Sequence, residues 1–303
     1  MRASPRLFHV DAFTRTPFRG NSAGVVLDAD ALSANRMQDM ARELRHSETA
    51  FVMAPQGNDH DVHIRYFTPT TEVPICGHAT IAAHYARARW LGLGNAVVRQ
   101  KTGAGIQTIG IETDGDDYHV SMEQGPISFS EPFDAELRRR IAHGLGLAEH
   151  DLDATQPVQI VSTGHSKVMV PLRAGVAIDA ITPDLGKLAA LSAAIGCNGF
   201  FPFLIRAGEA ATDGRMFAPA IGIPEDPVTG NANGPLGAYL VKHRLMAHDG
   251  RQLRFDGHQG RAMRRDGVVN VEVDIVRGEP LKVTIRGDAV ILFSAVLEAG
   301  VLP

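Results

Sequence analysis

The stretch RYFTPTTEVPICGHATIAAHYA, residues 65–86, is echoed by RMFAPAIGIPEDPVTGNANGPLGAYL, residues 215–240. Both begin Arg-x-Phe-x-Pro at a spacing of 150, and both reach a glycine, Gly77 or Gly230, that precedes a run rich in Ala and Gly. Small residues on every face are typical of a helix enclosed on all sides, because a surface helix shows a charged stripe. Three residues matched at one spacing, followed by similar helix starts, favour an internal duplication over coincidence.

Strands are expected around both helices, because alternating segments rich in β-branched residues surround them. These segments cover residues 62–67, 118–122, 159–170, 268–276 and 281–285. The chain is therefore expected to have an α+β fold. It would contain two pseudo-symmetric domains, each a β-barrel-like curled sheet around one central helix.

The junction between the two copies is expected around Gln124 to Pro132, where the sequence EQGPISFSEP breaks the strand pattern with a glycine and two prolines. We expect residues 1–125, completed by about 287–303, to form the N-terminal domain and residues 126–286 the C-terminal domain. A length of 303 residues suits two domains of roughly 150 residues each.

Composition excludes several classes of function. The chain has 30 Lys and Arg against 34 Asp and Glu, and a net charge of −4 gives no field that would attract nucleic acid. No run approaches the roughly 18 consecutive apolar residues of a membrane span. Its two cysteines, Cys76 and Cys197, lie too far apart for a disulfide framework or a clustered zinc site. We expect a cytoplasmic protein without a membrane partner.

Nucleotide cofactors are not expected either. Neither Gly92-Leu93-Gly94 nor Gly103-Ala104-Gly105 completes a dinucleotide fingerprint, and no phosphate-binding loop motif occurs. We therefore expect no cofactor and no metal.

The two expected helix starts are candidate anion sites. A helix that begins at a glycine presents unpaired backbone N–H groups and the positive end of its dipole, and glycine lets a ligand approach the backbone closely. If Gly77 and Gly230 faced one cleft, the two starts would hold a small, carboxylate-bearing substrate between them. A single start of this kind is weak evidence, whereas a pair related by duplication points to a ligand.

Three residues near these starts are candidates for chemistry. Glu48 precedes an expected strand and caps no obvious helix. If its carboxyl group faces an apolar cleft, its pKa is raised, as a reversible proton carrier needs. A solvated loop carboxylate fits the same pattern. Asp226 is either catalytic or a turn residue stiffened by Pro227. His78 is either functional or a packed residue of its helix.

Several ordered motifs resemble those of the phenazine biosynthesis PhzF family, which shares the diaminopimelate epimerase fold. The resemblance covers essentially the whole chain. It rests on FHVDAF (8–13), FRGNSAGVV (18–26), SETAF (47–51), PICGHAT (74–80), DPVTG (226–230), and on Gln259-Gly260 and Arg265.

The resemblance implies a cofactor-free isomerase, commonly a homodimer, with its active site in the cleft between the two domains. It implies that Glu48 shuttles a proton while His78 and Asp226 bind and polarise the substrate. Substrate contacts are expected from Gly77, Gly230 and Asn231 at the two helix starts, as the repeat predicts. Asn21 and Cys76, which lie within the family's motifs, are expected to contact the substrate as well.

Departures from the family pattern keep other functions open. Asn231 stands where the family often has a serine, and Asn cannot relay a proton in the same way. Racemases of this fold use two cysteines, one before each central helix; Cys76 matches the first position, but Thr229 occupies the second and cannot replace a thiolate. A metabolite-binding protein without catalysis is the third possibility. The joint presence of Glu48, His78 and Asp226 favours an enzyme.

Overall fold

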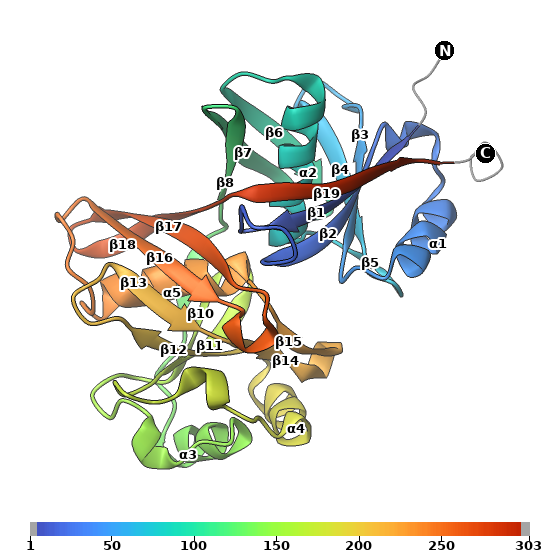
Figure 1. The fold of residues 1–303 in the computed structure, drawn as a ribbon. Coiled ribbons are helices and arrows are strands. Elements are labelled where there is room, and N and C mark those ends of the chain that lie inside the picture. Colours follow the sequence, from blue (N-terminus) through green and yellow to red (C-terminus); the bar gives the residue numbers. More distant parts are fainter. Residues whose placement is uncertain (1–4, 298–303) are drawn as a thin grey trace. The chain divides into compact units, whose positions relative to one another are not determined.

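The structure is a computed structural model that describes residues 5–297 and divides into two units (Figure 1). Unit 1 combines the chain up to Glu123 with the segment from Arg286 onward, and unit 2 is Gln124–Ile285. The outer ends of the expected N-terminal domain, residues 1–4 and 298–303, lie outside the described residues. Between residues 5 and 297, the structure has no helix long and apolar enough to cross a membrane.

Unit 1 contains one curled sheet of mixed direction. From one edge its strands run β19, β1, β2, β3, β4, β6, β7 and β8, and the pairs β2–β3 and β4–β6 are parallel. The short strand β5 extends β4. The bounds are β1 Arg6–Ala12, β2 Asn21–Leu27, β3 Thr49–Met53, β4 Val62–Phe67, β5 Glu72–Val73, β6 Ala96–Thr102, β7 Gly105–Asp114, β8 Asp117–Glu123 and β19 Ala289–Val296.

Helix α2 (Gly77–Leu91) forms the centre of unit 1. It contacts β1, β2, β3, β7, β8 and β19, so the sheet curls around it. Its residues Gly77 to Ala86 are all buried, in keeping with the lack of a charged stripe in this part of the sequence. Helix α1 (Ala34–Leu44) begins after Ser33, whose side chain accepts a hydrogen bond from the Arg36 N–H group.

Unit 2 repeats this plan around helix α5 (Gly230–Lys242), which contacts β10, β11, β16 and β17. The strands β9, β10, β11, β12, β13, β16 and β17 pair in that order, and β11–β12 and β13–β16 are parallel. The bounds are β9 Ile127–Phe129, β10 Gln159–Thr163, β11 Ser166–Pro171, β12 Phe200–Ile205, β13 Ala211–Gly214, β14 Met216–Ala218, β15 Ile223–Asp226, β16 Gln252–Gln259, β17 Gly267–Val276 and β18 Glu279–Gly287.

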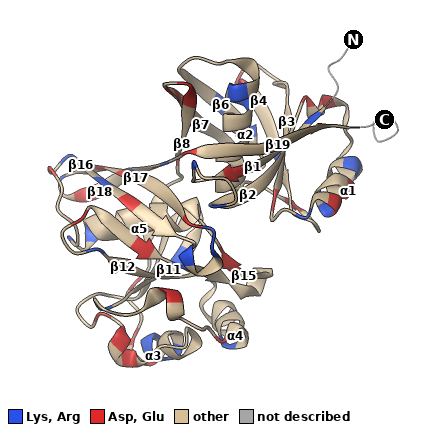
Figure 2. Cartoon of the chain, viewed as in Figure 1, with Lys and Arg blue, Asp and Glu red and all other residues tan. Residues whose placement is uncertain are grey.

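Unit 2 also carries two outer helices, α3 (Ala135–Gly144) and α4 (Leu185–Ile195), which contact each other. Their apolar side chains, including Ile141, Leu188 and Leu191, share one core cluster with Phe200 of β12. Both charge signs lie along α1 and α3 (Figure 2), in keeping with the small net charge.

The duplication is visible in matched interactions. Arg65 forms a two-pronged ion pair with Glu72 at 2.7 and 2.8 Å, and Arg215 forms the same pair with Glu225 at 2.8 Å for both contacts. Each guanidinium also lies over the phenylalanine two residues later in the chain. The α+β fold of two similar halves is thus confirmed.

Candidate active site

Glu48 lies between α1 and β3, where the chain turns into the sheet of unit 1. The N–H group of Gly24 on β2 donates to the backbone oxygen of Glu48 at 3.3 Å, which ties this segment to the parallel β2–β3 pair. The side chain is mostly buried, with 14% of its surface exposed.

Cys76 and His78 flank the first residue of α2. Cys76 is the N-cap residue, although its side chain makes no capping hydrogen bond, and His78 follows Gly77 at the start of the first turn. Both side chains are buried.

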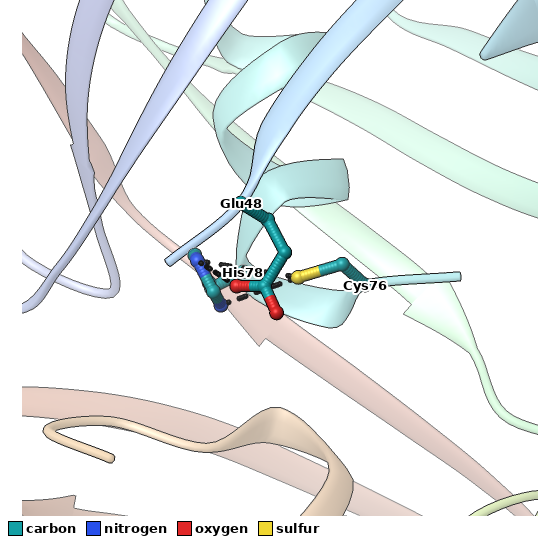
Figure 3. A group of neighbouring side chains, drawn as sticks. All are labelled: Glu48, Cys76 and His78. Atoms are coloured by element: carbon teal, nitrogen blue, oxygen red, sulfur yellow. Dashed lines mark hydrogen bonds and ion pairs between the residues drawn. The ribbon is translucent and has the colours of Figure 1, made fainter. Parts of the chain in front are cut away.

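These three side chains form one cluster (Figure 3). The His78 Nε2 atom lies 3.4 Å from Glu48 Oε2, and the Cys76 Sγ atom lies 3.4 Å from His78 Nδ1. The hydroxyl group of Ser47 lies 3.3 Å from His78 Nε2. A buried carboxylate beside an imidazole is an arrangement that can hold and return a proton.

A buried hydrogen-bond chain fixes the start of α2. The Tyr66 hydroxyl lies 2.6 Å from Thr80 Oγ1, and Thr80 donates both its hydroxyl and its N–H to the backbone oxygen of Cys76. Burial raises the pKa of Tyr66, so this phenol stays neutral and serves as a structural link. The chain holds Cys76 and His78 in place for contact with Glu48.

In unit 2, Asp226 ends β15 just before the start of α5. Its carboxylate accepts a hydrogen bond from the hydroxyl group of Thr229, the N-cap residue. The Gln259 side chain accepts from the Thr229 N–H at 3.0 Å and donates to the backbone oxygen of Asp226 at 2.7 Å. Asp226 is therefore a turn residue, which is one of its two expected roles. The same hydrogen bonds also fix the direction of its carboxylate.

Asn231 is held by a second glutamine. Gln124 donates to Asn231 Oδ1 at 3.2 Å and to the backbone oxygen of Gly230 at 3.3 Å, while Thr163 donates to Gln124 Oε1. The amide group of Asn231 is thus oriented by the residue at the junction of the two copies.

Lys167 is a difference between the two halves. On β11, Met169 pairs with Phe201; on β2, Val26 pairs with Phe51, the residue that corresponds to Phe201 in the repeat. Lys167 lies two residues before Met169 and Gly24 two residues before Val26, so Lys167 occupies the position that Gly24 has in unit 1. A Cβ atom on Gly199 would lie 2.3 Å from Lys167 Cδ, which shows that the missing side chain makes room for the lysine.

Burial lowers the pKa of Lys167, and the acidic groups of Cys197 and Asp226 act in the opposite direction. Its Nζ atom donates to the backbone oxygen of Ser166 at 3.0 Å. The Lys167 amino group therefore lies near enough to the Asp226 turn for the two charges to interact.

The sequence candidates thus fall into two groups. Glu48, Cys76, Gly77 and His78 come together in unit 1, and Asp226, Gly230 and Asn231 come together in unit 2. Asn21 is the buried first residue of β2. The sequence alone assigned no role to Ser47, Gln124, Thr163 or Lys167. Two of these residues carried a signal, since Ser47 begins the SETAF motif and Gln124 lies at the expected junction of the two copies.

Residues 10–295 match the family described as phenazine biosynthesis-like protein, PhzC-PhzF. Isomerase YddE of Escherichia coli K12 is 60% identical over 291 residues, which cover 96% of this chain and 97% of the relative. Trans-2,3-dihydro-3-hydroxyanthranilate isomerase of Pseudomonas aeruginosa is 35% identical over 79% of this chain and 81% of its own.

Solved structures show the same fold. The PhzF-family phenazine biosynthesis protein of Bacillus anthracis superposes with a TM-score of 0.85 at 32% identity, covering 98% of this chain and 99% of that one. The chain therefore belongs to the phenazine biosynthesis-like PhzF family and is an isomerase of that family.

Proposed function

We propose that this isomerase moves a proton on a small, carboxylate-bearing substrate without a cofactor, and that Glu48 is the general acid and base. The observation that carries the proposal is the 3.4 Å approach of Glu48 Oε2 to His78 Nε2 in a mostly buried cluster. A carboxyl group placed there can exchange a proton with substrate carbon while the imidazole orients it.

The proposed step conserves every atom of the substrate. The Glu48 carboxylate removes a proton from a C–H bond next to a double bond of the substrate. The electron pair of that C–H bond forms a new double bond, and the π electron pair of the original double bond moves to its far carbon. The protonated Glu48 then returns the proton to a different carbon, so the carboxylate is regenerated. His78 supports this by holding the carboxylate in one orientation, and the Ser47 hydroxyl group contacts His78 Nε2 in turn.

The backbone N–H groups at the starts of α2 and α5 are proposed to bind the anionic groups of the substrate. Helix N-termini stabilise negative charge, and both starts have glycine as the first residue. We further propose that Asp226 and Asn231 contact the substrate from the α5 start, since Thr229 and Gln124 fix their orientations.

A relative's substrate offers the first compound to test. The P. aeruginosa relative is named for isomerising trans-2,3-dihydro-3-hydroxyanthranilate, a small carboxylate. Incubation of this compound and related unsaturated carboxylates with the enzyme, followed by proton NMR, should reveal a product of unchanged mass with a shifted double bond. Binding of such compounds without turnover would favour the non-catalytic function instead.

The thiol of Cys76 is not required for this chemistry, because its counterpart before α5 is Thr229. We expect Cys76→Ala to lose less than about tenfold in kcat/KM, equivalent to about 1.4 kcal/mol of transition-state stabilisation. Steady-state kinetics on purified variants tests this. Loss of all turnover in a folded Cys76→Ala protein would support racemisation through a thiolate.

Lys167→Met is expected to weaken binding of the anionic substrate but to stabilise the fold by about 0.5–2 kcal/mol. The pKa of Lys167 is lower in the folded protein than its unfolded value of about 10.4. At pH values between these two pKa values, the unfolded chain therefore binds more protons than the folded protein. Wild-type stability therefore rises with pH through that window, and the penalty of burying the ammonium group is complete below it.

Urea unfolding of wild type and Lys167→Met at several pH values tests this. The gain of the methionine variant should be largest at neutral pH and shrink toward pH of about 10. A constant gain, or a less stable variant at neutral pH, would refute the role of the buried charge.

A further inference from the structure

We propose that Glu48, Cys76 and His78 bind a Zn²⁺ ion, and that this ion reversibly inhibits the isomerase by occupying its proton carrier. The inhibitory part rests on the proposed function of Glu48, whereas the metal site rests on geometry alone. One ligand atom from each of the three side chains lies within 4.8 Å of the other two. Figure 3 shows the three side chains converging from the segment before β3 and the start of α2.

The separations suit tetrahedral zinc. With Zn–S of about 2.3 Å and Zn–N and Zn–O of about 2.0–2.1 Å, sulfur and nitrogen lie about 3.6 Å apart and nitrogen and oxygen about 3.3 Å apart. In the structure, His78 Nε2 is 3.4 Å from Glu48 Oε2 and 4.0 Å from Cys76 Sγ. The Cys76 Sγ atom lies within 4.8 Å of the Glu48 carboxylate, whereas sulfur and oxygen lie about 3.6 Å apart in a tetrahedral site. Side-chain shifts of up to about 1.2 Å therefore complete a three-ligand site, which leaves the fourth position to water.

The chemical types of the ligands select the ion. A thiolate, an imidazole and a carboxylate together match Zn²⁺ rather than Mg²⁺ or Ca²⁺, which prefer oxygen ligands alone. The charges also balance, since the thiolate and the carboxylate neutralise the two positive charges of the ion. This matters because the three side chains are mostly buried, and a buried net charge is costly.

Binding has a defined proton balance and a defined consequence. The Cys76 thiol releases its proton to solvent, and His78 binds as neutral imidazole. The lone pair of Glu48 that would accept the substrate proton is then donated to the metal, so the carboxylate no longer acts as a base. Turnover would stop until a chelator removes the ion.

The test combines a binding readout with an activity readout. Co²⁺ alone, as a spectroscopic substitute for Zn²⁺, should give a saturable thiolate-to-cobalt absorption band in wild type, and Zn²⁺ should displace it. Cys76→Ala should lack the band and bind Zn²⁺ at least about 10–100-fold more weakly. Removal of a residue that only hydrogen-bonds to a metal ligand already lowers affinity by that factor, and Cys76 would be a ligand itself.

Cys197→Ala is the matched control, because this second buried cysteine lies in unit 2. It should keep both the band and the zinc sensitivity of turnover. Inhibition, expressed relative to each variant's own zinc-free rate, should be reversed by EDTA in wild type and absent from Cys76→Ala.

Three outcomes would overturn the proposal: no cobalt band, a band that persists in Cys76→Ala, or stoichiometric zinc binding without loss of turnover. The absorption band needs no substrate, so the metal site can be judged even where the role of Glu48 fails. Conversely, Glu48→Gln could prove inactive while the wild type binds no zinc. That pair of results would refute the metal site and leave the proposed function standing.

Discussion

Glu48→Gln is expected to lower kcat by about 10²–10⁴-fold while leaving the fold and ligand affinity largely intact. Glutamine has nearly the same shape as glutamate but cannot accept and return a proton. The change retains an oxygen that can contact His78, which lies 3.4 Å away in the wild type. Steady-state kinetics gives the loss in kcat, and circular dichroism with urea unfolding shows whether the fold persists.

The matched control for this variant is Glu43→Gln, an exposed position near the end of α1. It also removes one carboxylate from unit 1 and should leave kcat unchanged. Full activity in Glu48→Gln would refute the assignment of the proton carrier.

Glu225→Gln is expected to destabilise the protein by about 3–5 kcal/mol, the typical cost of removing one partner of a buried ion pair. Arg215 is only 7% exposed and Glu225 only 16%. Two backbone oxygens, those of Ile178 and Ile181, also accept hydrogen bonds from Arg215 and keep the guanidinium in place. Without Glu225, that charge stays buried with neutral partners alone.

The duplication supplies an internal comparison for this prediction. The corresponding pair in unit 1, Arg65 and Glu72, has side chains that are 26% and 44% exposed. Glu72→Gln should therefore cost only about 0–1 kcal/mol, as for surface pairs. Urea unfolding of both variants measures the difference, and equal losses would contradict the dependence on burial.

The sequence was sufficient to predict the helices at the centre of each unit. A glycine followed by small residues on every face indicated enclosed helices at Gly77 and Gly230, and α2 and α5 begin at those residues. The strand over 62–67 was predicted with its observed bounds. The strand expected over 159–170 is instead two strands, because Gly164 has a φ of 102° and forms the turn between β10 and β11.

Long-range contacts set the rest of the site, and local patterns do not contain them. Gln124 reaches Asn231 across 107 positions of sequence, and no spacing rule predicts that amide pair. Lys167 lies where it does because Gly199, the residue before β12, lacks a side chain, and this contact depends on the register of β11 and β12. The approach of Glu48 to His78 likewise follows from the sheet that joins their segments.

The most direct test of the central claim follows one substrate in D₂O with wild type and Glu48→Gln, using proton NMR to detect isomer formation and exchange of the C–H proton. Trans-2,3-dihydro-3-hydroxyanthranilate is the first compound to use, and any other compound that the wild type isomerises serves equally. Wild type should form the isomer, whereas Glu48→Gln should bind the compound but form the isomer and incorporate deuterium at least about 100-fold more slowly. Isomer formation or deuterium incorporation by Glu48→Gln at a rate close to that of wild type would contradict the role of Glu48 as proton carrier.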